Sequence, residues 1–221
     1  EQLGIHRQVR PYGQTAIIAN ITSSQGHDGV AYERFTPNGP LALLPMSAGR
    51  SALVWTQPDA QVDEVMTLSD AAFLEALQDA FGFRMGALTR VGQRHAYPLS
   101  LIEAEEQVRT GLVVLGNAAH SLHPIAGQGF NLSLRDAMAL ADTLIDAPAH
   151  GAPGDLRLLE GYLDRQRQDQ QQTIAFSDGL TRLFSNRRPV LAAGRNLGLL
   201  GMDIVAPLKS VFARQAMGLK G

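Results

Sequence analysis

The chain of 221 residues contains no cysteine, which excludes disulfide bonds, thiolate nucleophiles and cysteine-based metal sites. It also has no excess of one charge, because 19 lysines and arginines oppose 21 acidic residues and leave a net charge of −2. Nucleic-acid interfaces are normally marked by a basic patch, so we expect no nucleic-acid partner. With 45% hydrophobic residues, the chain is long enough to bury the core of one or two domains.

Residues 110–134 lack Asp, Glu, Lys and Arg, and a charge-free stretch of this length is long enough to cross a bilayer. Polar side chains and helix breakers interrupt it, among them Asn117, His120, Pro124 and Gln128. A continuous apolar helix is therefore not expected, and the sequence predicts no transmembrane span there.

The most informative stretch is GLVVLGNAAHSLHPIAGQGFNLSLRD, residues 111–136. Residues 111–116 are apolar and β-branched, as in a buried strand, and from about Gly127 apolar residues recur at helical spacing. That helical stripe consists of Leu132, Leu134, Met138, Leu140, Ala141 and Leu144. A helix that opens on glycines presents bare N–H groups and the positive end of its dipole, equivalent to about half a unit charge. Such a terminus suits an anion or an electron-rich carbonyl, although the same small residues also suit a tight turn needed only for packing.

This stretch resembles the second flavin-binding motif of the aromatic hydroxylase flavoproteins, the single-component FAD-dependent monooxygenases. Their pattern is Gly-Asp-Ala-Ala-His, a short gap, Pro, then Gly-Gln-Gly and Asn. Here it stands as Gly116, Asn117, Ala118, Ala119, His120, Pro124, Gly127, Gln128, Gly129 and Asn131. Segments 35–46, 96–101 and 194–203 are similar to the branch of the family that acts in ubiquinone biosynthesis. Asn117 stands where most of the family has Asp. Asn keeps one carbonyl acceptor for a ribityl hydroxyl, but it does not carry the negative charge.

The resemblance implies an FAD site. Its residues are Gly116, Asn117, Ala118, Pro124, Ala126, Gly127, Gln128, Gly129, Phe130 and Asn131. Backbone N–H groups at 127–131 would stabilise negative charge on reduced flavin, and glycines there permit close approach. The resemblance further implies an oxidoreductase in which NAD(P)H reduces the flavin, O2 adds to it, and a flavin hydroperoxide hydroxylates a polyprenyl phenol. No residue is identified as a catalytic base, so the catalytic side chains stay unknown.

The Gly-x-Gly-x-x-Gly fingerprint with which the family holds the ADP half of FAD is absent, and so is its Gly-Asp-Gly box. We therefore interpret the chain as the C-terminal portion of a longer enzyme, inactive alone, whose N-terminal half is its partner. Two alternatives stay open: a non-catalytic fragment that acts as an interaction module, and another flavin oxidoreductase of the same fold.

The expected fold class is mixed, α+β and α/β, with three regions. These are a substrate-domain β-sheet over 10–105, the C-terminal part of an FAD-binding Rossmann-like domain over 106–150, and a helical region over 151–221. Strands are expected at 14–22, 30–36, 41–47, 51–57, 87–99 and 111–116, the last in a parallel sheet formed mainly by the missing half. Helices are expected from a Ser69 N-cap to Phe81 before Gly82, and from Asp155 to Phe184. Within the second helix, the run RQRQDQQQ at 165–172 is interpreted as a solvated face.

A few side chains outside the motif are candidates for chemistry. The resemblance implies that Pro40, Leu44, Pro45 and Tyr97 line the substrate pocket, although the residues alone suit core or edge positions equally well. His120 and His123 are three residues apart, but no third ligand lies at suitable spacing, so no metal site is expected. Arg135 is interpreted as a salt-bridge partner and Asp136 as a complement to the helix dipole.

Apolar residues dominate 190–219, where basic residues exceed acidic ones. The simpler interpretation is that this segment docks on the core of the longer enzyme, and the alternative is peripheral contact with a membrane. We expect a cytoplasmic protein that can lie at the periphery of the inner membrane.

Overall fold

The computed structural model describes residues 3–147 and 152–184, which divide between two compact units. The sheet unit comprises Pro11–Leu99 and the described residues from Thr181 onward. The loop–helix unit comprises the described residues up to Arg10 together with Ser100–Leu180. The chain passes from one unit to the other inside two strands, β1 (Arg7–Ser23) and β6 (His95–Ala104), and near the end of one helix, α4 (Leu156–Phe184). The expected boundaries at 105/106 and 150/151 stay a prediction.

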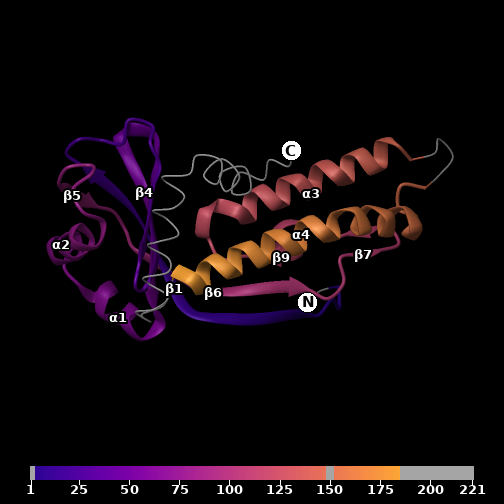
Figure 1. The fold of residues 1–221 in the computed structure, drawn as a ribbon, viewed down its shortest axis with the longest axis horizontal. Helices are drawn as coiled ribbons and strands as arrows, with labels where there is room; N and C mark the ends of the chain where they lie inside the picture. The colour runs from indigo at the N-terminus through magenta and orange to yellow at the C-terminus, as the bar shows by residue number, and fades with distance from the viewer. Residues whose placement is uncertain (1–2, 148–151, 185–221) are drawn as a thin grey trace. The chain divides into compact units, whose positions relative to one another are not determined.

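An antiparallel sheet forms the sheet unit, with strand order β2 (Tyr32–Thr36), β3 (Gly39–Pro45), β4 (Arg50–Pro58) and β1 (Figure 1). The short strand β5 (Leu88–Val91) pairs with the end of β1. A 3-10 turn, η1 (Ser47–Gly49), joins β3 to β4, which confirms the antiparallel hairpin predicted there. Neighbouring segments of the chain therefore form the pairs β2–β3 and β3–β4, whereas β1 pairs with the more distant β4 and β5.

Helix α2 (Asp70–Phe81) begins and ends where the sequence predicts. The hydroxyl of Ser69 accepts a hydrogen bond from the Ala72 amide at 3.3 Å, so Ser69 is the N-cap. Gly82 follows with φ of +83°, and its amide donates to the Gln78 carbonyl at 2.7 Å. Glycine suits this position because a side chain is strained at positive φ.

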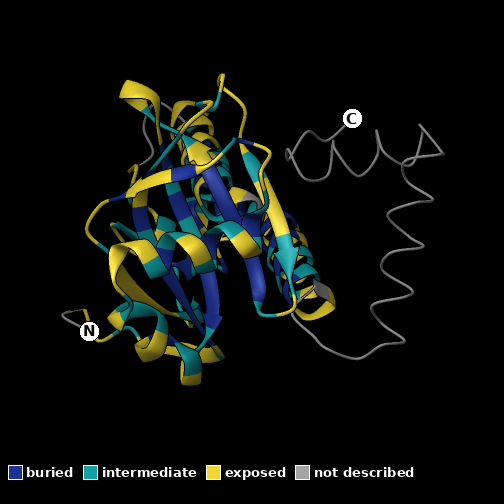
Figure 2. Ribbon diagram, turned by 90° about the vertical axis from the view of Figure 1, so that its left-hand side faces the viewer, coloured by how far each residue is buried: buried dark blue, intermediate teal, exposed yellow. Residues whose placement is uncertain are grey.

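The hydrophobic core of the sheet unit lies between the sheet and α2. Alternate residues of β1, β3 and β4 point inward, as the two-residue period of a strand requires. These residues and their partners include Ile17, Ala19, Ile21, Leu41, Leu43, Leu53, Trp55, Phe73, Leu77 and Phe81. Trp55 and Phe73 meet edge to face at 5.5 Å between ring centroids, and the Arg94 guanidinium lies 5.0 Å from the Phe73 ring centroid. In Figure 2 these strands are largely dark blue, so the sheet is the most buried part of this unit.

Two features of the sheet unit differ from the prediction. Helix α1 (Asp59–Thr67) was not expected, and it follows β4 directly. The single strand expected at 87–99 is wrong, because β5 and β6 are separate strands. Gly92 donates from its amide to the Asn20 carbonyl at 2.8 Å, and Arg94 turns toward the Leu68 carbonyl at 2.7 Å. The Gly92 bond continues the pairing of β5 with β1, and the residues after it leave the ladder before β6 begins.

The loop–helix unit is formed by short strands and two long helices. Its described elements are the end of β6, β7 (Val108–Arg109), β8 (Leu112–Val113), η2 (Gly116–Ala118), β9 (His120–Ser121), η3 (Ile125–Gly127), α3 (Gln128–Ile145) and most of α4. The end of β6 pairs antiparallel with β9. The start of the chain belongs here too, because Arg10 pairs with Glu103 and the Glu105 amide donates to the His6 carbonyl at 3.0 Å. This mixture of helices and antiparallel strands confirms the expected mixed α/β class.

The strand predicted at 111–116 is shorter than expected. Only Leu112–Val113 form a strand, and they pair antiparallel with β7 through a turn at Gly111, whose φ is +72°. Since β7 is the only partner of β8 within the described residues, the pairing is limited to two residues on each side. The parallel sheet expected for this strand stays a prediction.

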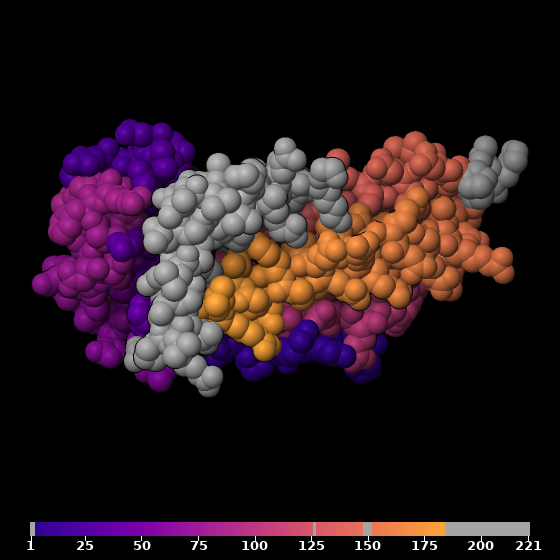
Figure 3. Space-filling model, in the orientation of Figure 1, coloured from indigo at the N-terminus to yellow at the C-terminus, as the bar shows by residue number. Residues whose placement is uncertain are grey.

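Helices α3 and α4 lie side by side in Figure 1 and present adjoining surfaces in Figure 3. Helix α3 begins within one residue of the predicted start, and α4 matches both predicted bounds within one residue, but their buried faces differ from the prediction. On α3 only Leu132 of the expected apolar stripe is buried, whereas Leu134, Met138 and Leu144 are exposed. On α4 the run 165–172 is not wholly solvated, because Asp169 and Gln170 are buried. The interface between the helices is therefore largely polar.

Within residues 3–147 and 152–184, no helix combines the length and the apolar character that a membrane crossing requires. The apolar segment at 190–219, for which membrane contact was the alternative interpretation, lies outside the described residues.

Candidate functional site

The candidate flavin loop is the segment Gly116–Asn131, which runs from η2 through β9 and η3 into the first turn of α3. Helix α3 contacts both η2 and η3, so the two halves of the motif come together although they are separate in the sequence. A Cβ built on Gly116 would lie 3.6 Å from the Ser133 hydroxyl oxygen, which places η2 beside the second turn of α3. The loop therefore folds back over the start of the helix that it enters.

The N-terminus of α3 is open. Its N-cap is Gly127 with φ of +61°, and no side-chain cap is present among the described residues. A Cβ on Gly127 or Gly129 would meet no described atom within 4 Å, so the backbone there can be approached closely. Asn117, Ala118, Pro124 and Phe130 are exposed around this terminus, whereas the side chain of Gln128 is buried. The positive end of an 18-residue helix, approached past glycines without side chains, fits an electron-rich carbonyl or anion.

A buried hydrogen-bonded pair joins the middle of the loop to α3. His120 Nε2 lies 2.7 Å from Asp136 Oδ2, and the two side chains are 1% and 0% exposed. Gln170 of α4 donates from Nε2 to the same carboxylate at 3.2 Å and exchanges hydrogen bonds with Gln107 at 3.1 and 3.2 Å. Asp136 therefore accepts from two elements at once, and the loop, α3 and α4 are connected through it.

The interpretation of Asp136 as a complement to the helix dipole is wrong, since its carboxylate points inward and pairs with His120. The sequence does indicate the inward position of Asp136, because Asp136 lies four residues after Leu132 and so shares a helix face with that buried leucine. Gln107 and Gln170 carried no signal that the sequence alone could reveal. Tyr162 is buried nearby, and burial, with a smaller effect of the Asp136 charge, raises the pKa of its hydroxyl well above the usual value.

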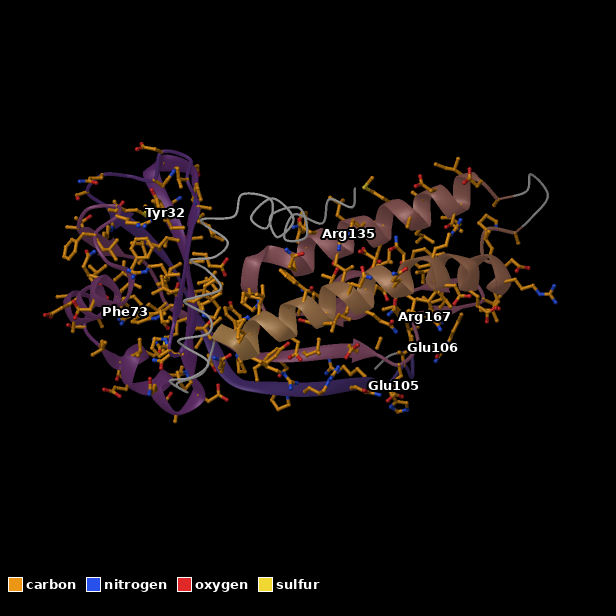
Figure 4. The ribbon with its side chains drawn as sticks, viewed as in Figure 1. Tyr32, Phe73, Glu105, Glu106, Arg135 and Arg167 are labelled. Atoms are coloured by element: carbon orange, nitrogen blue, oxygen red, sulfur yellow. The ribbon has the colours of Figure 1, made fainter. Side chains whose placement is uncertain are left out.

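Arg135 is a salt-bridge partner, as predicted. Its Nε lies 2.6 Å from Asp169 Oδ2, and its Nη2 donates to the Thr173 hydroxyl at 3.0 Å. Figure 4 shows Arg135 on the side of α3 that faces α4. The bonds fix the relative rotation of the two helices, so the helix that carries the candidate flavin loop has a defined orientation on α4.

A cavity of about 350 Å³ lies between the end of β6, the start of β9 and α4. Its lining includes His120 and Gln170 of the buried network, together with Glu103, Glu105 and Arg167. A polar cavity of this size holds water readily. Among the described residues, no group of three or more His, Asp or Glu side chains is placed to hold a metal ion.

His123 also belongs to the loop, and it is 1% exposed. Burial lowers the pKa of its imidazole from 6.5 to about 4. Below pH 6.5 the unfolded chain takes up a proton at His123 that the folded chain does not. The contribution of His123 to stability is therefore fully present above pH 6.5 and is lost as the pH falls toward 4.

We expect the free energy of unfolding to fall by about 2 kcal/mol between pH 7 and pH 4.5 because of this group. Urea unfolding at the two pH values measures the fall, and the variant His123→Leu should show a correspondingly smaller one. His95→Leu, at an exposed histidine, is the matched control and should behave like the unaltered chain. Equal falls in all three proteins would contradict the assignment to His123.

The residues predicted to line a substrate pocket lie in the sheet unit. Alternation along β3 places Pro40 and Leu44 on the face opposite the core and Pro45 on the other face. Pro40 is buried, Leu44 is 40% exposed and Pro45 is half-buried. Tyr97 is 56% exposed and belongs to β6, which is not adjacent to β3 in the sheet. Pro40 and Leu44 therefore share a face, and their role in binding substrate stays a prediction.

Comparison with known proteins identifies an FAD-binding family. The FAD binding domain family matches residues 3–177. Ubiquinone hydroxylase UbiL of Rhodospirillum rubrum is 41% identical over 219 residues, covering 99% of this chain and 51% of that protein. The 3-demethoxyubiquinol 3-hydroxylase of Escherichia coli is 32% identical, covering 98% of this chain and 55% of that protein. The chain thus spans about half the length of the curated relatives that it matches.

The solved structure of p-nitrophenol 4-monooxygenase PnpA from Pseudomonas putida matches with a TM-score of 0.75, covering 99% of this chain and 57% of that one. At 18% identity this likeness shows the fold alone. The family match covers most of the chain, and the relatives confirm the resemblance to hydroxylases of ubiquinone biosynthesis. The chain therefore belongs to the family of FAD-binding domains found in flavin-dependent monooxygenases.

Proposed function

We propose that this chain supplies the flavin loop and the substrate sheet of an FAD-dependent monooxygenase that hydroxylates a polyprenyl phenol in ubiquinone biosynthesis. The observation that carries the proposal is the open N-terminus of α3, with Gly127 as its N-cap and Gly129 exposed to close approach. The relatives named as ubiquinone and demethoxyubiquinol hydroxylases support the substrate class. NAD(P)H as electron donor, O2 as co-substrate and peripheral attachment to a membrane belong to the same proposal.

FAD, when bound, supplies the redox chemistry and the activation of oxygen, and the chain contributes position and electric field. Amides at Gly129 and Phe130 would donate toward the carbonyl edge of the ring system, where reduction places negative charge. Asn117, exposed on η2, would accept a hydrogen bond from a hydroxyl of the ribityl chain through its side-chain carbonyl. The bonds of His120 and Asp136 hold this loop in place before any ligand arrives.

The sheet face opposite the core suits an apolar ring. It carries apolar side chains at adjacent positions, since Ala42 pairs with Val54 and Leu44 pairs with Ala52. Val54 in turn pairs with Ile18 of β1. A face of this kind can pack against an aromatic ring or an isoprenoid chain, which favours the proposed substrate class.

The test uses Gly127→Ala in a protein that joins this chain to the amino-terminal half of the R. rubrum relative. Alanine at φ near +60° costs about 1 kcal/mol wherever it is placed, so Gly26→Ala is the matched control, with φ of +72° and no described atom within 4 Å of its Cβ. We expect both variants to lose similar stability and only Gly127→Ala to bind FAD at least tenfold more weakly, measured by the flavin absorption spectrum. Oxygen uptake with NADH or NADPH should then depend on an added polyprenyl phenol. Equal FAD affinity in the two variants, or oxygen uptake indifferent to the phenol, would overturn the proposal.

A further inference from the structure

Strand β2 carries two charged residues on opposite faces of the sheet. Arg34 pairs with the core residue Leu41, and its guanidinium donates to the Phe81 carbonyl at the end of α2. Tyr32, two residues earlier, packs edge to face on Phe81 with ring centroids 6.0 Å apart. Because side chains alternate along a strand, Glu33 lies on the other face. We call this face, opposite the core, the outer face of the sheet.

Glu33 lies beside the residues predicted to line the substrate pocket. It pairs with Ala42 of β3, and residues directly opposite in antiparallel strands have Cβ atoms about 4.5–5.5 Å apart. On the outer face of β3, Ala42 lies between Pro40 and Leu44. The side chain of Glu33 is exposed, so a ligand that packs on these three residues can meet its carboxylate.

The outer face around Glu33 is otherwise uncharged. Three successive rows of paired residues cross β2, β3, β4 and β1, and Glu33 belongs to the middle row. The other side chains of these rows are Ala42, Val54 and Ile18 in the middle row, Phe35, Pro40, Thr56 and Ala16 on one side, and Leu44, Ala52 and Asn20 on the other. Along β4 the next charged residue on this face is Arg50, four residues from Val54 and therefore roughly 14 Å away along the strand. Glu33 is thus the only ionisable side chain in the three rows.

A single carboxylate on an apolar face suits the hydroxylation of a phenol. The ring carbon gives electrons to the incoming oxygen atom, and the phenolic proton becomes more acidic as it does so. A carboxylate within hydrogen-bond reach accepts that proton, so the O–H bond of the phenol breaks and an O–H bond forms on the carboxylate. The proton returns to the ring oxygen when the hydroxylated carbon releases its own hydrogen as a proton to solvent. The ring and NAD(P)H each lose two electrons, which together reduce O2 to the new hydroxyl group and water.

We propose that Glu33 is the catalytic base of this hydroxylation and that its carboxylate accepts the phenolic proton of a substrate bound on the outer face of the sheet. The inference rests on the proposed function, because it assigns a residue to the reaction proposed there. It also predicts a preference among ligands, since a free phenol can donate a hydrogen bond to Glu33 and its methyl ether cannot. Hydrogen bonds to a charged acceptor are about twice as strong as those between neutral groups.

The kinetics of Glu33→Gln test the role in catalysis. The variant is made in the protein that joins this chain to the amino-terminal half of the R. rubrum relative, and oxygen uptake is measured at saturating polyprenyl phenol. Glutamine has nearly the same size but cannot take up the proton, so we expect kcat to fall by about 10²–10⁴-fold. The matched control is Glu75→Gln at an exposed glutamate of α2, which should leave kcat unchanged. A fall of less than tenfold for Glu33→Gln would overturn the inference.

Binding without turnover gives a second and independent measurement. The affinities of the same proteins for a short-chain prenyl phenol and for its methyl ether are compared by calorimetry with no electron donor present. We expect the unaltered protein and Glu75→Gln to bind the phenol at least tenfold more tightly than the ether, and Glu33→Gln to lose most of this preference. Equal affinities for the two ligands in the unaltered protein would overturn the inference. Oxygen uptake that depends on the phenol but is insensitive to Glu33→Gln would overturn this inference alone, whereas uptake that ignores the phenol in the unaltered protein would overturn the proposed function as well.

Discussion

Replacement of Asp136 by alanine is expected to lower the free energy of unfolding by about 3 kcal/mol. The carboxylate is 0% exposed and accepts hydrogen bonds from His120 and from Gln170, so its removal leaves two buried donors without an acceptor. Each unsatisfied buried donor costs about 1–3 kcal/mol, and water in the neighbouring polar cavity regains only part of this cost. The loss should appear in urea unfolding followed by far-ultraviolet circular dichroism.

Asp142→Ala is the matched control, because Asp142 is an exposed aspartate on the same helix. It should change the free energy of unfolding by less than about 0.5 kcal/mol. The double variant His120→Leu, Asp136→Leu should recover part of the loss, since it removes the donor and the acceptor together. Equal effects of the two alanine substitutions would mean that the pair contributes nothing to stability.

Phe73→Ala is expected to lower the free energy of unfolding of the sheet unit by about 4 kcal/mol. The Phe73 ring is 0% exposed at the centre of the core, where it meets Trp55 edge to face and lies under the Arg94 guanidinium. Alanine would leave a cavity, and both ring contacts would be lost with the transfer free energy of the side chain. The chain has a single tryptophan, so Trp55 fluorescence reports this unit specifically.

Phe83→Ala supplies the comparison, because Phe83 is 72% exposed and the same atoms are removed from the surface. Its effect should be below about 1 kcal/mol. If fluorescence and circular dichroism give the same large shift for Phe73→Ala, the two units unfold together. If only fluorescence shifts, they unfold separately. A small fluorescence shift would contradict the central position of Phe73.

Local patterns predicted the elements whose signals are themselves local. Helix α2 has its cap at Ser69 and its stop at Gly82, and the hairpin between β3 and β4 has short strands on both sides of a turn. The start of α3 followed from the glycines at its N-terminus. Such features depend on a few neighbouring residues, so one sequence suffices to find them.

Features that depend on distant partners were missed. The buried faces of α3 and α4 are polar because Asp136 and Asp169 find partners on other elements, and hydrophobic periodicity cannot reveal such pairings. The break between β5 and β6 was likewise missed, and in the structure the Arg94 side chain between them bonds to the distant Leu68 carbonyl. The residues of the flavin loop could be named from the motif, whereas the network that holds the loop became visible only in three dimensions.

In the loop–helix unit, segments that pair with one another are synthesised far apart in time. Arg10 pairs with Glu103 across 93 residues, and Arg109 donates to the Leu3 carbonyl across 106. At a translation rate of about 5–20 residues per second, the first strand waits roughly 5–20 s on the ribosome before its partners emerge. The residues made in the interval, Pro11–Leu99, form nearly all of the sheet unit, which can fold first. The nascent chain would thus hold one finished unit while the part of β1 outside that unit stays unpaired, a state that molecular chaperones are suited to protect.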